Sequence, residues 1–143
     1  MNPRVIEDYQ DCGVDVGRIV GTMIRRAPRG CLDGLDAIEI LDSSPDGRGF
    51  ACYHKDRRRI KLFVRDLIAW QPWLLRKSIF FPYLAIGLAL GHEIDHHVNR
   101  DNEEVEKEQH AEANALEYIH PFFHVMKPIR KVVTFLRRRG KKV

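Results

Sequence analysis

Hydrophobic residues recur at three- and four-residue steps through most of this chain, and short runs of alternation interrupt them before residue 65. Between residues 4 and 26 the apolar stripe consists of Val5, Ile6, Tyr9, Cys12, Val16, Ile19, Val20, Met23 and Ile24. Such spacing predicts a first helix. Gly13, Gly17 and Gly21 follow it at four-residue intervals and indicate close packing of the helix against a neighbouring element.

Three short strands are predicted between residues 36 and 64. Residues 36–42 suit one strand, and residues 50–54 and 60–64 suit a hairpin, because apolar and polar positions alternate in its second half. We expect residues 60–64 to be the edge of a small three-stranded mixed sheet. Strands grouped between helices predict an α+β fold rather than a parallel βαβ array.

Helices are predicted again from residue 67. A helix over residues 67–81 should break near Pro72, and residues 83–98 are apolar almost all round as far as Gly91. The uncharged run of residues 78–91 has 14 residues. A membrane-spanning helix needs about 20, so a buried helix is favoured. Asn102 is a suitable N-cap for one more helix.

The composition fits one domain over residues 1–143, with enough apolar residues for a core. The acidic N-terminus has no hydrophobic signal-peptide segment, and the three cysteines show no C-x-x-C spacing. Both features favour a reducing cytoplasm.

The basic character belongs to the C-terminal tail. Residues 126–143 carry eight Lys or Arg and no acid, so the other 125 residues sum to −4 within the total of +4. An apolar face in residues 125–143 predicts a helix docked on the core. The alternatives are binding of nucleic acid or an anionic surface, and folding into the cleft as a pro-segment that keeps the full-length chain latent. The tail has no base-reading residues that favour nucleic acid.

The candidate chemistry lies in residues 91–97, Gly-His-Glu-Ile-Asp-His-His. On a helix, His92 and His96 stack on one face and can hold one metal ion together. Glu93 lies about 100° round the helix, where it can act as general base on a water at that metal. H-E-x-x-H also occurs by chance, so a third ligand is needed to decide whether these residues form a metal site.

Catalytic zinc usually takes three protein ligands. The metzincin pattern is excluded, because it needs Gly and His where this chain has Asn99 and Asn102. On the next predicted helix, Glu112 shares a face with apolar residues, and a carboxylate there needs a cation. Glu112 is therefore the predicted third ligand. His110 lies off that face, and Glu108 stays a rival ligand or an outer partner.

The quoted H-E-x-x-H residues, followed by Ala111-Glu112-Ala113-Asn114 and by Ile119-His120-Pro121, resemble the gluzincins. More narrowly, they resemble the ImmA/IrrE-type minimal zincin metallopeptidases. The resemblance implies a zincin-like fold, one Zn²⁺ held by His92, His96 and Glu112, and Glu93 as the catalytic base. It also implies hydrolysis of peptide or protein substrates, with an extended segment paired to the edge strand.

The second reading is a catalytically silent regulatory or nucleic-acid-associated module that kept this fold. No single oxyanion donor is favoured among Tyr53, His54, Tyr118, His120 and His124. A latency-conferring thiol at Cys31 is disfavoured against an ordinary free cysteine.

Overall fold

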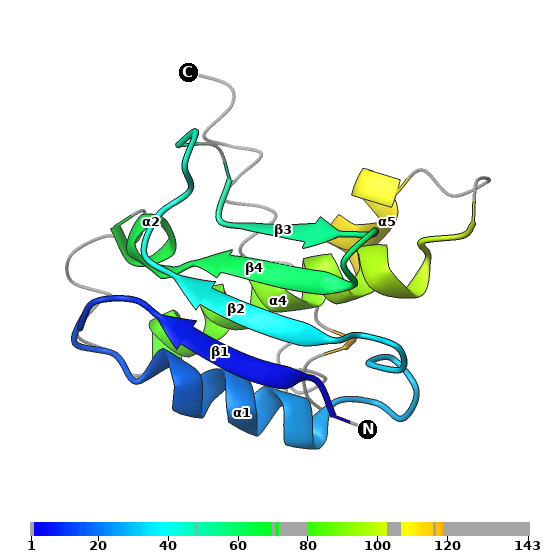
Figure 1. Ribbon diagram of the computed structural model, residues 1–143, viewed down its shortest axis with the longest axis horizontal. Helices are drawn as coiled ribbons and strands as arrows, with labels where there is room; N and C mark the ends of the chain where they lie inside the picture. Colours follow the sequence, from blue (N-terminus) through cyan, green and yellow to red (C-terminus); the bar gives the residue numbers. More distant parts are fainter. Residues whose placement is uncertain are drawn as a thin grey trace.

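A computed structural model describes residues 2–47, 49–69, 71, 80–102, 107–115 and 117–118 of the chain. Over these residues, strands and helices follow the order β1, α1, β2, β3, β4, α2, α4, α5. The four strands form one mixed sheet in the order β1-β2-β4-β3, shown in Figure 1. The predicted α+β class is confirmed, with one strand more than the sequence suggested.

The additional strand is β1 (Arg4–Asp8), which pairs in parallel with β2 (Ala37–Leu41). Helix α1 (Val16–Arg26) connects the two, so this part of the chain is a βαβ unit. The helix begins after Asp15, whose side chain accepts a hydrogen bond from the Arg18 N–H at 3.0 Å. The prediction of helix from residue 4 was wrong up to this cap, because pairing with β2 outweighs the local helical spacing.

The hairpin consists of β3 (Ala51–His54) and β4 (Arg59–Phe63). Strand β4 lies inside the sheet, parallel to β2 on one side and antiparallel to β3 on the other. The prediction of an edge at residues 60–64 was therefore wrong, and the edges are β1 and β3. Residue 64 opens a short helix instead, α2 (Val64–Ala69).

The core lies between one face of the sheet and helices α1 and α4 (Phe80–Val98). Ile38 pairs in register with Ile60, and Ile40 with Leu62, and all four are fully buried. Figure 1 shows α4 crossing behind β2 and β4. The other face is polar: Glu39 forms ion pairs with Arg59 and Lys61 at 2.7 and 3.9 Å.

Helix α4 carries the H-E-x-x-H residues from the core to the edge of the sheet, as the sequence predicted for residues 83–98. It begins slightly earlier, at Phe80, and Pro82 lies in its first turn, where the missing N–H costs little. Ile86, Leu90 and Ile94 recur at four-residue steps and are buried in the core. Helix α5 (Lys107–Asn114) then packs against α4.

Several predictions lie outside the described residues. They are residues 70 and 72–79 of the expected 67–81 helix, the first turn at residues 103–106, and the basic segment of residues 125–143. Residues 80 and 81 of the same expected helix belong to α4 instead. Within the part of the chain that the structure describes, no helix is long and apolar enough to cross a membrane.

Candidate metal centre

His92 and His96 face each other on one side of α4, as the motif predicted. Their Nε2 atoms lie 3.1 Å apart, and their rings meet edge to face with centroids 4.8 Å apart. Burial, followed by the neighbouring His92, lowers the pKa of His96. The neutral imidazole is therefore favoured, which is the form that binds a metal ion.

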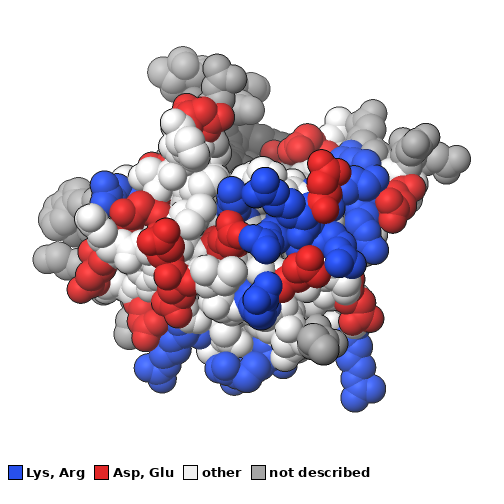
Figure 2. Space-filling view, viewed as in Figure 1, with Lys and Arg blue, Asp and Glu red and all other residues white. Residues whose placement is uncertain are grey.

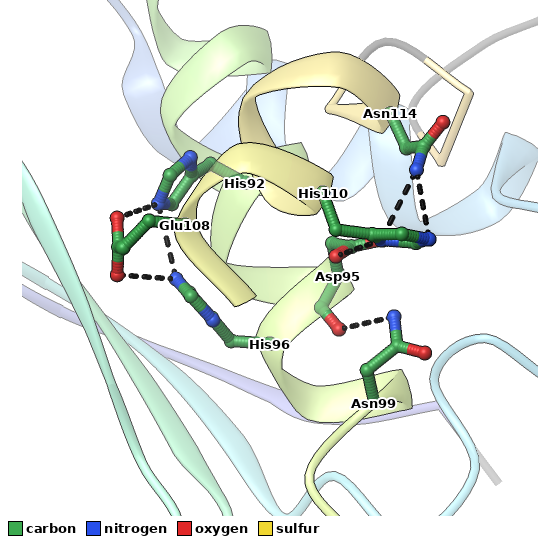
Figure 3. Close-up of polar contacts among 7 residues, drawn as sticks. All are labelled: His92, Asp95, His96, Asn99, Glu108, His110 and Asn114. Atoms are coloured by element: carbon green, nitrogen blue, oxygen red, sulfur yellow. Dashed lines mark hydrogen bonds and ion pairs between the residues drawn. The ribbon is translucent and has the colours of Figure 1, made fainter. Parts of the chain in front are cut away.

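Glu108 of α5 completes a triangle with these histidines (Figure 3). Its carboxylate oxygens lie 3.4 Å from His92 Nε2 and 3.2 Å from His96 Nε2. A tetrahedral zinc ion with bonds of about 2.0–2.1 Å holds neighbouring ligand atoms about 3.3 Å apart. The two imidazole nitrogens, 3.1 Å apart, are close to this spacing. The distances of 3.2 and 3.4 Å belong to different oxygens of Glu108, Oε1 and Oε2, and bring its carboxylate within reach of the same ion.

The centre is open on its Glu108 side. The Glu108 side chain is 80% exposed, whereas those of His92 and His96 are 24% and 16% exposed. Ion pairs of so exposed a carboxylate are weakened by solvent and contribute little to stability. A catalytic zinc site needs such an opening, because one coordination position must stay accessible to water and substrate.

Glu112, the third ligand predicted from the sequence, does not join this cluster in the structure. It is exposed, while Ala111 of α5 and Ala115, which directly follows the helix and donates to the Ala111 carbonyl at 2.9 Å, are buried. A helix turns by about 100° per residue, and angles about its axis can be measured from Ala111. Ala115 then lies at about 40°, Glu108 at about 60° and Glu112 at about 100°. The inward face is thus centred near the alanines, which turns Glu108 rather than Glu112 towards the histidines.

Glu93 lies beside the metal cluster and is 7% exposed. Burial raises its pKa to about 7, the negative charge of Glu108 adds to the rise, and a hydrogen bond from the Tyr53 backbone opposes it. This bond agrees with the hairpin register. Phe63 N donates to Phe50 O at 2.8 Å, so the Tyr53 N–H and C=O point away from β4.

A cavity of about 480 Å³ joins these groups. It lies between the outer edge of β3, the C-terminal half of α4 and the start of α5. Its lining residues are Cys52, Tyr53, Lys55, His92, Glu93, His96, Arg100, Lys107 and Glu108. The sequence pattern did not indicate Lys55, Arg100 or Lys107, because their positions depend on how three separate segments meet.

Asp95 forms a second polar cluster on the other side of α5 from His92 and His96 (Figure 3). It is fully buried, and its Oδ2 lies 2.7 Å from His110 Nδ1. The amide nitrogen of Asn114 lies 3.1 Å from both ring nitrogens of His110. Burial first, and then the hydrogen bond to Asp95, raise the pKa of Tyr118. The side chains of α5 are thus tied to α4 on both sides of the helix.

His97 supports the cavity from behind and is 1% exposed. Its Nε2 lies 3.0 Å from the Asp33 carbonyl, and its Nδ1 lies 2.9 Å from the Tyr53 hydroxyl. A carbonyl only accepts, so Nε2 carries the proton and Nδ1 accepts from Tyr53. This bond commits the Tyr53 hydroxyl, which makes it unsuitable as an oxyanion donor.

The other candidates for the oxyanion donor and for a latency-conferring thiol lie outside the cavity or outside the described residues. His54 lies 3.3 Å from the Cys52 thiol and is not among the residues lining the cavity. Cys31 is buried in the core, so it does not cap the metal cluster. His120 and His124 lie outside the described residues.

Comparisons with known proteins give no relative from which a function could be transferred. The metal cluster and the quoted motifs are therefore the whole basis for comparing this chain with the zincins. No family model matches the chain, and no curated protein or solved structure does so either.

Proposed function

We propose that this protein is a zinc-dependent peptidase of the minimal zincin type, with His92, His96 and Glu108 as ligands. The observation that carries the proposal is the triangle of two imidazole nitrogens and one carboxylate, with separations of 3.1 to 3.4 Å. Two neutral imidazoles and a carboxylate are a donor set that zinc prefers in catalytic sites.

Zinc, when bound there, supplies polarisation of a substrate carbonyl and lowers the pKa of a water to about 7. The Glu93 carboxylate would accept the proton of the attacking water as this water adds to the carbonyl. The same carboxyl group then passes the proton to the leaving amine. Burial raises the pKa of this carboxyl group to about 7 in the protein without metal.

The edge strand β3 supports the choice of a peptide as substrate. The C=O of Tyr53 points outward beside Glu93, which takes up the Tyr53 N–H, and an extended peptide can pair with this C=O in the manner of an added strand. Such pairing would bring a substrate carbonyl to the cavity that His92 and His96 line.

The test measures metal content and cleavage separately. We expect about one zinc per chain after purification without chelator, and cleavage products in a mixed peptide library analysed by mass spectrometry. Glu93→Gln should keep the zinc and lose activity by roughly 100- to 10,000-fold, the range for removing a general base. Glu117→Gln, which alters an exposed glutamate outside the cavity, is the matched control.

Four results would contradict the proposal. Metal content near zero, or unchanged metal content after replacing both His92 and His96 by Ala, would exclude the zinc centre. Bound zinc without cleavage of any peptide would favour the catalytically silent module instead. Cleavage unaffected by Glu93→Gln would exclude Glu93 as the general base.

A further inference from the structure

Three cations line the cavity beside the metal cluster. Lys55 comes from the β3–β4 turn, Arg100 from the end of α4 and Lys107 from the start of α5. The carboxylates among the described lining residues are Glu93 and Glu108, and the proposed mechanism uses both of them. Figure 2 shows basic side chains gathered over this end of the sheet.

The C-terminus of α4 explains why the cations gather. The Arg100 guanidinium donates to the His97 carbonyl at 2.9 Å, and Lys55 and Lys107 donate to the Arg100 carbonyl at 2.8 and 3.5 Å. Carbonyls at a helix C-terminus carry partial negative charge, so cations are stabilised there. These bonds fix the cations at the wall of the cavity.

Helix carbonyls do not neutralise this charge. Among the described residues, the carboxylate paired with these cations is Asp101, at 3.2 Å from Lys55 and 3.5 Å from Arg100. Its side chain is 75% exposed, so both pairs are weakened by solvent. With Glu93 and Glu108 of the lining counted beside Asp101, three cations face three carboxylates, so the surplus of positive charge in the cavity would be that of a bound Zn²⁺.

We propose that the cavity selects substrates that carry a carboxylate close to the bond to be cleaved, with Lys55 and Lys107 as its main partners. This inference rests on the proposed peptidase function. Lys107 is the most available of the three, because its contact among the described residues is one carbonyl at 3.5 Å. Lys55 and Arg100 are each engaged by a carbonyl and by Asp101, and the Lys55 ammonium keeps one N–H for a substrate. The carboxylate can be an acidic side chain or the free C-terminus of the substrate.

Four matched peptides distinguish these sources. One sequence is prepared with Glu or Gln beside the cleavage site, and each version with a free or an amidated C-terminus. We expect kcat/KM to be at least about fivefold higher for the carboxylate-bearing peptides at low salt, the effect of one screened ion pair of about 1 kcal/mol. Added KCl should reduce the difference. Equal kcat/KM for all four peptides would overturn the inference.

Lys55→Gln and Lys107→Gln should each raise KM for the preferred peptide by about two- to fivefold. For the amidated peptide with Gln beside the cleavage site, the KM of both variants should be that of the wild type. Arg57→Gln removes the same charge from the same turn, but Arg57 does not line the cavity, so its KM should match the wild type. Zinc content, measured in parallel, shows whether Lys107→Gln disturbs Glu108. An equal rise in KM in Arg57→Gln would mean that the net charge of the protein, and not the position of the lysines in the cavity, causes the effect.

An equilibrium measurement separates this inference from the peptidase proposal. Zinc-loaded Glu93→Gln protein is titrated with the Glu and Gln peptides, both amidated and carrying a neutral dye, followed by fluorescence anisotropy. The free-acid Gln peptide is titrated as well. Tighter binding of either carboxylate peptide supports the inference even if no peptide is cleaved. Equal binding of all three contradicts it, whatever the wild-type activity.

Discussion

Glu108 and Glu112 stand one turn apart on α5 in different surroundings, and this difference separates the two possible ligand sets. Glu108 contacts both imidazoles, while Glu112 is exposed outside the cluster. We expect Glu108→Gln to weaken zinc binding by more than about 100-fold, the upper limit for residues that only orient a ligand. Glu112→Gln should bind zinc like the wild type, measured by competition with a chromophoric chelator. The opposite order would restore the ligand predicted from the sequence.

Cys31 offers a second prediction at the level of a single residue. It is 8% exposed, and burial raises its thiol pKa to about 11. Because a raised pKa favours the neutral thiol, the reactive thiolate stays scarce at neutral pH and increases only as the pH approaches 11. Pulse alkylation followed by peptide mapping should therefore label Cys31 slowly at pH 8 and rapidly in urea. Rapid labelling of the native chain would place this thiol at the surface.

Single residues also mark how far sequence reasoning reached into the site. His92, His96 and Glu93 could be predicted because one helix fixes their relative positions through its own periodicity. The third ligand depends on the rotation of a second helix about its axis. That rotation is set by the buried alanines Ala111 and Ala115, which give too weak an apolar signal to locate the inward face.

At the scale of elements, α4 was predictable and β1 was not, for a common reason. Helix α4 is apolar over several turns, so the sequence of this segment alone is enough to predict a buried helix. Strand β1 is largely exposed, and it is a strand because its main chain pairs with β2, 33 positions further along. The edge of the sheet was misplaced for the same reason, since the sequence shows that β4 is a strand without showing its neighbours.

The glycines around α1 give a prediction at this scale. Gly13 precedes the helix with φ of +75°, whereas a side chain at Gly21 would meet the Arg25 guanidinium at 3.5 Å, an ordinary contact. We expect Gly21→Ala to raise the free energy of unfolding by up to about 1 kcal/mol through helix propensity. Gly13→Ala should lower it by about 1–2 kcal/mol, because its backbone is left-handed. Urea denaturation measures both, and shifts of equal sign would contradict this assignment.

The close packing predicted for the glycine strip stays a prediction. A side chain at Gly17 would collide with the carboxylate end of Glu7 on β1, but this exposed side chain is flexible and can move aside, so the collision does not show a close approach of the two backbones. At Gly13 the requirement is backbone conformation instead, which spacing alone cannot distinguish from packing.

For the whole molecule, the proposed metal centre would link α4, which belongs to the core, to α5, which packs against α4. A ligand that binds only the folded state stabilises it by about 2.7 kcal/mol at 100 times its Kd. For a domain of this size, we expect zinc to raise Tm by roughly 5–10 °C under those conditions. EDTA should reverse the shift in differential scanning fluorimetry. The variant with both His92 and His96 replaced by Ala is the control, and an equal shift in that variant would mean that zinc binds elsewhere.

All residues lining the cavity come from position 52 onward, while β1, α1 and β2 contribute support alone. Selection for catalytic side chains would therefore act on the second half of the described chain. In the first half, selection would act on side-chain volume in the core and on strand pairing. Both can be maintained through many exchanges among apolar residues. Descendants of this chain should thus keep His92, Glu93 and His96 recognisable while their first fifty residues diverge until only the pattern of buried positions is shared.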